Sequence, residues 1–133
     1  MISSRRTVRI RSQSDIHNAV HMVRELAIGC GMSTGASAAI ATAVSELVTN
    51  VVKYADSGRM TCHVKKRLAQ PGIEVLVEDH GPGIHDIDRA MKNHESTGGT
   101  LGLGLPGARR LVDEFEITSK PGEGSSVRVV KWG

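Results

Sequence analysis

Three short segments of the sequence carry residue types that together suit a site for a metal-bound nucleoside triphosphate. A glutamate and an asparagine stand four positions apart as Glu46-x-x-x-Asn50, inside a long helical pattern. An aspartate at the end of an apolar strand pattern opens the run Asp79-His80-Gly81-Pro82-Gly83. A glycine-rich run, Gly98-Gly99-Thr100-Leu101-Gly102-Leu103-Gly104, precedes another helical pattern. The Glu46 acid, the Asn50 amide and the Asp79 carboxylate, each in its own surroundings, are the groups that such a site requires.

Glu46 and Asn50 lie one helical turn apart on the same face, because each residue advances an α-helix by roughly 100°. They flank the apolar stripe of this helix, and two interpretations are open. Either they form an ordinary helix-surface pair, or the Asn50 carbonyl oxygen binds Mg²⁺, a hard cation that prefers oxygen ligands and brings phosphate oxygens with it. In the second interpretation, Glu46 takes the proton from an attacking hydroxyl.

Asp79 follows the apolar strand residues 75–77 and precedes Gly81 and Gly83. An acid followed by a glycine turn is common in any protein, so the position of Asp79 carries the argument. A carboxylate that emerges from a buried strand can accept a hydrogen bond from an exocyclic amine such as adenine N6. The two glycines let the backbone approach a flat ring closely.

The third segment also matches the dinucleotide pattern G-x-G-x-x-G letter for letter, over residues 102–107. That fingerprint requires a preceding strand in a parallel βαβ unit and an acid about 20 residues further on. Residues 93–100 are polar and glycine-rich instead. We therefore favour a loop whose backbone N–H groups, with a helix N-terminus behind them, hold triphosphate oxygens. Gly98 and Gly99 fit the hinges of a lid that closes over the nucleotide.

Length, composition and charge limit the class of protein. The 133 residues suit one domain with a single core, spanning residues 1–133. With a net charge of +3 and only 2% aromatic residues, the chain lacks the basic stripe and stacking aromatics expected of a nucleic-acid-binding protein. No apolar run approaches about 18 residues and no signal-like segment opens the chain, so we expect a cytoplasmic protein without membrane contact. Cys30 and Cys62 are expected to be buried free thiols.

The hydrophobic pattern predicts the elements that must position these residues. Helices are expected from Ser14 or Asp15 to Gly29, from Gly35 to Ala55 and from Leu105 to Glu114, with a short one over residues 87–91. Strands are expected over residues 8–11, 60–68, 73–78, 115–119 and 125–131, with a turn around Gln70-Pro71-Gly72. Residues 92–103 have no periodicity and are expected to form a mobile loop. This order predicts an α/β two-layer sandwich with a mixed β-sheet and helices on one face.

Together these segments resemble the Bergerat-fold ATPases, a superfamily that includes gyrase and the histidine kinases. The match comprises the Glu46–Asn50 box, the Asp79–Gly83 box, the Gly102–Gly104 box and a final Gly124-Ser125, over essentially the whole chain. Within it, phrases such as Ser96-Thr97-Gly98-Gly99 and the ending Val130-Lys131-Trp132 look most like the small switch serine/threonine kinases of the bacterial stressosome.

The resemblance implies a role for each matched residue. Glu46 would be the general base for the substrate hydroxyl, and Asn50 would hold Mg²⁺ against the phosphates of ATP. Asp79 would bind adenine in a pocket shaped by Gly81 and Gly83. The glycine-rich run would contact the nucleotide through its backbone, at Gly98, Gly99, Gly102, Leu103 and Gly104.

Three further residues have weaker support. Ser125 stands where the family often has threonine, a change that keeps a hydroxyl near Asp79 and adenine. Lys53 and Tyr54 are similar to the Lys-Tyr pair that follows the asparagine in many histidine kinases and touches phosphate and the adenine ring. The switch kinases need not keep this pair, so the alternative is a solvated Lys53 and a Tyr54 in the core.

The resemblance also implies a function. The expected enzyme is a serine/threonine protein kinase that uses Mg-ATP to phosphorylate STAS-domain proteins, the scaffold and antagonist proteins of a stressosome. Once released, it would bind and activate a metal-dependent phosphatase. One alternative is an anti-sigma factor kinase that binds a sigma factor directly. Another is an ATP-responsive binding module without catalysis, against which Glu46 argues. The oligomeric state stays open, and neither a nucleic acid nor a membrane is expected as a partner.

Overall fold

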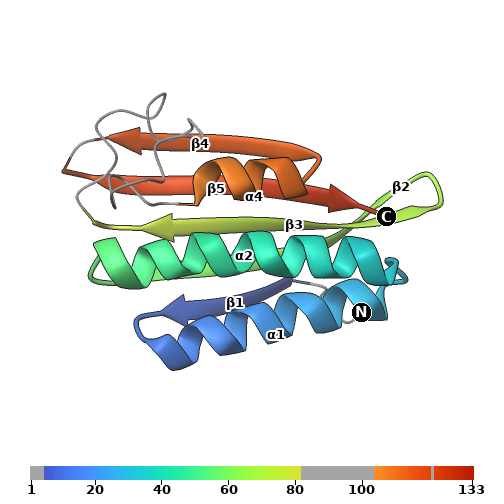
Figure 1. Cartoon of the computed structure of the whole chain (residues 1–133), viewed down its shortest axis with the longest axis horizontal. Helices are drawn as coiled ribbons and strands as arrows, with labels where there is room; N and C mark the ends of the chain where they lie inside the picture. The colour runs from blue at the N-terminus through green and yellow to red at the C-terminus, as the bar shows by residue number, and fades with distance from the viewer. Residues whose placement is uncertain (1–4, 82–103, 121) are drawn as a thin grey trace.

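The computed structural model describes residues 5–81, 104–120 and 122–133, and these form two layers (Figure 1). One layer is a five-stranded sheet of β1 (Arg5–Ile10), β2 (Gly58–Arg67), β3 (Gln70–Asp79), β4 (Glu114–Lys120) and β5 (Gly124–Trp132). The other layer consists of the helices α1 (Gln13–Gly29), α2 (Thr34–Tyr54) and α4 (Leu105–Leu111). All three helices cover the same face of the sheet (Figure 1). The expected α/β two-layer sandwich with helices on one face is confirmed.

The strand directions in the sheet differ from the expectation. The strands lie in the order β1-β2-β3-β5-β4, and each of the four pairings is antiparallel. The expected mixed sheet is therefore wrong. β3 and β4, which the connection through α4 joins, do run parallel to each other, but β5 lies between them. The connection from β3 to β4 would give a parallel pair if these strands were neighbours. Because β5 lies between them, each pairs antiparallel with β5 instead.

The core between the two layers is built from aliphatic side chains at the predicted helical spacing. The buried stripe of α2 includes Ile40, Val44, Leu47 and Val51. Alternate residues of the central strands join the same cluster, among them Met60, Val75 and Val129. Because full burial of one such side chain contributes about 1.5–3 kcal/mol, the stripe holds α2 in one position over the sheet.

Among the described residues, α2 is the one helix long and apolar enough to cross a membrane by length and composition. The expectation that the chain has no such segment is therefore too strict. Ala43, Val44 and Val48 of this helix are completely buried within the protein. Packing in the core accounts for the apolar composition of α2.

The start of α1 is defined by hydrogen bonds to an aspartate in its first turn. The Asp15 carboxylate accepts from the backbone N–H groups of Arg11 at 2.9 Å and Ser12 at 3.1 Å. The bond from the Arg11 N–H has the largest effect, and together these bonds lower the pKa of Asp15. Ser12 is therefore the N-cap, slightly before the expected start at Ser14 or Asp15.

The third predicted helix is shorter than expected. α4 ends at Leu111, because Glu114 already pairs with Val130 in the sheet. The helix expected over residues 87–91 and the loop expected over residues 92–103 lie outside the described residues.

The hairpin between β2 and β3 turns at Leu68 and Ala69. The turn expected around Gln70-Pro71-Gly72 is wrong, because these residues belong to β3. A Cβ on Gly72 would lie 2.4 Å from the Cε3 atom of Trp132. The glycine therefore makes room for an indole ring on the sheet rather than for a change of chain direction.

Candidate functional site

Four elements meet at one end of the molecule, where the predicted site residues gather. The C-terminal half of α2 lies near the end of β3, the start of β5 and the start of α4 (Figure 1). Three close approaches join these elements, namely Asp79 with Ser125, Gly81 with Ala55, and Glu46 with Gly104. A small residue occupies one side of each approach.

The Asp79 carboxylate is anchored by three hydrogen bonds. Its Oδ2 accepts from the Ser125 hydroxyl at 2.6 Å, and its Oδ1 accepts from the backbone N–H groups of Gly81 at 2.9 Å and Ser125 at 3.3 Å. An ionised carboxylate offers about four lone-pair positions, so the described residues 5–81, 104–120 and 122–133 leave one position on Oδ2 for another donor. The residue is half-buried, and this position suits one N–H group of a ligand.

Two glycines to which the sequence argument gave no role lie beside Asp79 where the chain packs too closely for a Cβ. Gly124 has a φ of +100°, and a Cβ there would lie 2.1 Å from the carbonyl oxygen of Asp79. Gly58 faces Asp79 from β2, and a Cβ there would lie 2.7 Å from Val51 Cγ1 on α2. Gly124 was part of the family match, whereas nothing in the sequence distinguished Gly58 from an ordinary turn residue.

Gly81 brings the turn after β3 against the end of α2. A Cβ on Gly81 would lie 2.7 Å from the Cβ of Ala55 and 3.1 Å from the carbonyl oxygen of Tyr54. This contact is compatible with a pocket wall formed by Gly81, a role that stays a prediction. The other predicted backbone contacts to the nucleotide lie outside the described residues, namely Gly83, Gly98, Gly99, Gly102 and Leu103.

Glu46 is exposed on α2 and lies against the residue that caps α4. A Cβ at Gly104 would lie 2.1 Å from Glu46 Oε2, and Gly104 itself has a φ of +67°. The carboxylate thus fits against the bare Cα of a residue in the left-handed region, where glycine is favoured. The contact places an acidic group at the C-terminal end of the predicted phosphate-binding run.

The remaining predicted residues of α2 follow Glu46 along the helix. Asn50 is half-buried one turn later, while Lys53 and Tyr54 are exposed at the helix end. The alternative in which Tyr54 belongs to the core is wrong, because 46% of its surface is exposed. The structure therefore brings the predicted acid, the amide and the Lys-Tyr pair onto the same half of one helix.

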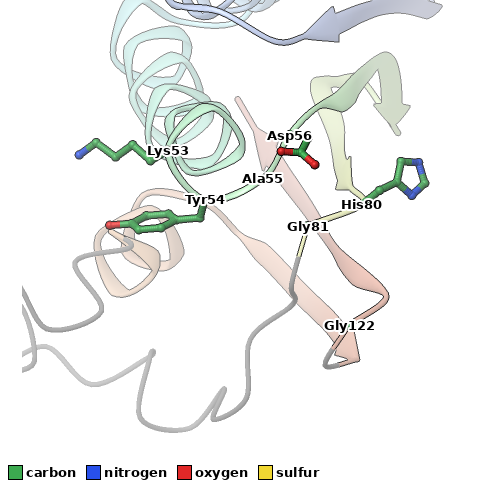
Figure 2. A pocket seen from close by; sticks show the side chains of 7 residues that line it. All are labelled: Lys53, Tyr54, Ala55, Asp56, His80, Gly81 and Gly122. Atoms are coloured by element: carbon green, nitrogen blue, oxygen red, sulfur yellow. The ribbon is translucent and has the colours of Figure 1, made fainter.

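An open hollow of about 470 Å³ lies between the end of α2 and the turn after β3. Its volume falls within the range of about 300–1,000 Å³ that is usual for small-molecule sites. Among the described residues, seven line it, namely Lys53, Tyr54, Ala55, Asp56, His80, Gly81 and Gly122. In Figure 2 the side chains of Lys53 and Tyr54 point to one side of the hollow and those of Asp56 and His80 to the other. Sequence reasoning assigned no role to Asp56, His80 or Gly122.

Comparison with known proteins identifies the family. Residues 11–131 match the family model of the histidine kinase-like ATPase domain. The matched range takes in α1, α2 and the strands that carry Asp79 and Ser125. The chain belongs to the histidine kinase-like ATPase family.

Relatives within this family narrow the class. The chain is 41% identical over 125 residues to the serine/threonine-protein kinase RsbT of Bacillus subtilis (strain 168). The aligned residues cover 94% of each chain. It is 34% identical over 97 residues to the anti-sigma F factor of Thermoanaerobacter sp. (strain X514). These residues cover 70% of this chain and 68% of the anti-sigma F factor. The first similarity, over nearly the full length of both chains, places this chain among the ATP-using serine/threonine protein kinases of the family.

A solved structure shares the fold. This structure is the histidine kinase domain from the Erythrobacter litoralis EL346 blue-light activated histidine kinase. The TM-score is 0.54 at 22% sequence identity, and the match covers 89% of this chain and 59% of that one. At this identity the likeness concerns the fold alone, and it agrees with the expected Bergerat-type arrangement.

Proposed function

We propose that this chain is a serine/threonine protein kinase that uses Mg-ATP to phosphorylate STAS-domain proteins of a bacterial stressosome. Residues 1–133 act as one ATP-binding kinase domain in the cytoplasm. After release from its scaffold, the kinase binds a metal-dependent protein phosphatase and activates it. The observation that carries the catalytic part is the contact of Glu46 with Gly104, in a chain that resembles a serine/threonine kinase over 94% of its length.

Asp79 supplies the adenine end of the proposed site. Its three bonds to residues that the structure describes leave one lone-pair position on Oδ2. The N6 amino group of adenine is a donor of the required kind, whereas guanine presents an acceptor, O6, at the corresponding position. An acceptor facing a carboxylate oxygen is repelled, so the site should prefer ATP to GTP.

Glu46 and Asn50 supply the phosphate end. When bound, ATP provides the transferred phosphoryl group and Mg²⁺ neutralises the charge that develops during transfer. The Asn50 carboxamide oxygen is a hard ligand suited to this cation. Glu46, which is exposed one turn away, accepts the proton of the substrate hydroxyl. Positioning by these groups, rather than covalent chemistry, should account for most of the rate.

Incubation of the purified chain with labelled ATP and candidate STAS-domain proteins, with and without Mg²⁺, tests the proposal. We expect Mg²⁺-dependent transfer of label to serine or threonine. Glu46→Gln preserves the size of the side chain but removes the base, so transfer should fall about 10²–10⁴-fold while calorimetry still detects ATP. Undiminished transfer would refute the base assignment, and no uptake of ATP or ADP at millimolar concentrations would refute the site.

A second candidate function is that of an anti-sigma factor kinase, which the 34% identity to an anti-sigma F factor favours. Such a protein binds a sigma factor directly, in addition to its phosphorylation activity. Affinity capture with this chain as bait, in the presence of ADP or ATP, separates the two functions. Recovery of a sigma subunit would favour the second candidate, and recovery of STAS-domain proteins alone would favour the first.

A further inference from the structure

The tip of the β2–β3 hairpin carries a leucine that the fold does not use. Leu68 is 98% exposed. It is also the single non-glycine residue with a positive φ, +55°, in the part of the chain that the structure describes. A bulky residue is uncommon in this region because its Cβ crowds the backbone. Both its conformation and its exposure are unfavourable for the isolated protein.

The geometry of the turn sharpens this point. Leu68 is the first residue of a two-residue loop, and Ala69 is the second. A positive φ at the first loop position alone is the pattern of a type II′ turn, in which glycine is favoured. Glycine would close the same hairpin with less strain, so the leucine side chain has no structural reason to be at this position.

The hairpin holds Leu68 on a fixed base. The guanidinium of Arg67 lies 4.3 Å from the ring centroid of Trp132, and it donates a hydrogen bond to Gln70 Oε1 at 3.0 Å. Trp132 in turn packs on Gly72 of β3. A side chain presented on such a base loses little conformational freedom on binding, which suits a contact with another protein.

Positive charge surrounds the tip. Residues 65–67 are Lys-Lys-Arg, and residues 58–73 contain no carboxylate. Lys65 already pairs with Glu74 at 3.6 Å, whereas Lys66 is exposed next to the tip. The surface that accepts Leu68 should therefore be an apolar pocket with aspartate or glutamate at its rim.

The tip and Asp79, which supplies the adenine end of the proposed site, lie at opposite ends of β3 (Figure 1). β3 runs from the hairpin to Asp79, and its 10 residues extend about 30 Å at about 3.3 Å per residue. A folded domain of about 100 residues has a radius of gyration of about 13 Å, hence a diameter of about 30 Å. One folded substrate domain is therefore as wide as the distance from the tip to the adenine end of the site, and it can contact the tip while its hydroxyl lies at the site.

We propose that Leu68 and Lys66 form a docking site for the folded protein substrate, remote from the site of phosphoryl transfer. The substrate contributes an apolar pocket edged by carboxylates. This inference rests on the proposed protein kinase function and adds the surface by which the kinase recognises its substrate.

Steady-state phosphorylation of the STAS-domain protein that the wild type modifies best tests the docking site. Leu68→Ala removes the side chain but keeps the Cβ in its strained conformation, and Leu68→Gly removes both. The matched control is Ile28→Ala, which truncates another large apolar side chain, 58% exposed on α1. Both Leu68 variants should raise KM for the protein substrate about ten-fold or more, with kcat and KM for ATP unchanged. Lys66→Glu should raise the same KM, most strongly at low salt.

Thermal unfolding distinguishes lost docking from lost folding. Leu68→Gly should unfold at the same temperature as the wild type or higher, because it relieves the unfavourable φ. An unchanged KM for the protein substrate in Leu68→Ala, or an equal rise in Ile28→Ala, would overturn the docking site. A wild-type chain that phosphorylates no STAS-domain protein would overturn the proposed function itself and the docking site with it.

Discussion

Replacement of Gly104 by alanine should test whether the Glu46 carboxylate has to lie where the structure places it. The alanine Cβ would have to occupy a point 2.1 Å from Glu46 Oε2. Glu46 is an exposed and flexible side chain, so we expect the carboxylate to move while the protein remains folded. The variant therefore displaces the proposed base without changing its chemistry.

Two separate effects determine the size of the change. A φ of +67° at residue 104 costs an alanine about 1–2 kcal/mol relative to glycine, which lowers Tm by about 4–7 °C in a chain of this size. Ordinary contact with a Cβ begins near 3.4 Å, so Glu46 Oε2 must retreat by more than an ångström. Because a misplacement of about 1 Å in a catalytic group costs about 10²-fold in rate, kcat should fall by about that factor.

The assay pairs thermal unfolding with phosphorylation of a STAS-domain protein. Gly31→Ala is the matched control, since Gly31 has a φ of +99° but its Cβ would meet, among the residues that the structure describes, nothing closer than Pro71 Cγ at 4.0 Å. It should show a similar loss of Tm with wild-type kcat. If Gly104→Ala also retains wild-type kcat, the reasoning that links the position of Glu46 to catalysis is refuted.

Three further predictions concern the rest of the molecule. Ser125→Ala should weaken ATP binding about ten-fold in calorimetry, because Asp79 loses its 2.6 Å bond, and Ser125→Thr should bind like the wild type; equal affinity of the alanine variant would contradict this. Burial raises the pKa of Glu74, but the hydrogen bond from Arg128 and nearby positive charges outweigh it and leave the pKa lowered. A lowered pKa contributes stability that is lost as the pH falls through its folded value. Glu74→Gln should therefore reduce the urea midpoint at neutral pH, and the difference from the wild type should shrink below about pH 4; a constant difference would argue against the ion pair. Burial also raises the pKa of the Cys62 thiol to about 11, so a thiol reagent near pH 8 should label Cys62 only after unfolding. Because Cys30 is only half-buried, the labelled site is identified by peptide mapping, and rapid labelling of Cys62 in the native protein would contradict its burial.

Much of the local structure could be predicted from the sequence, because it depends on neighbours in the chain. The apolar spacing along α2 placed Val44, Leu47 and Val51 in the core, and it placed Glu46 beside Asn50 on the rim. The strand ending at Asp79 was also predicted. The turn between β2 and β3 was not, because the proline and glycine at residues 71–72 are strong turn signals in isolation. In the folded chain both belong to β3, where Gly72 makes room for the indole ring of Trp132.

The sequence by itself determined which residue types were available for nucleotide chemistry and on which local elements they stand. Only the tertiary structure decided their partners, because those contacts join residues far apart in the chain. Asp79 and Ser125 are separated by 46 positions, and their hydrogen bond exists because β5 inserts between β3 and β4. The close approach of Glu46 to Gly104 likewise depends on the packing of α4 beside α2, where the absence of a Cβ leaves room for a carboxylate.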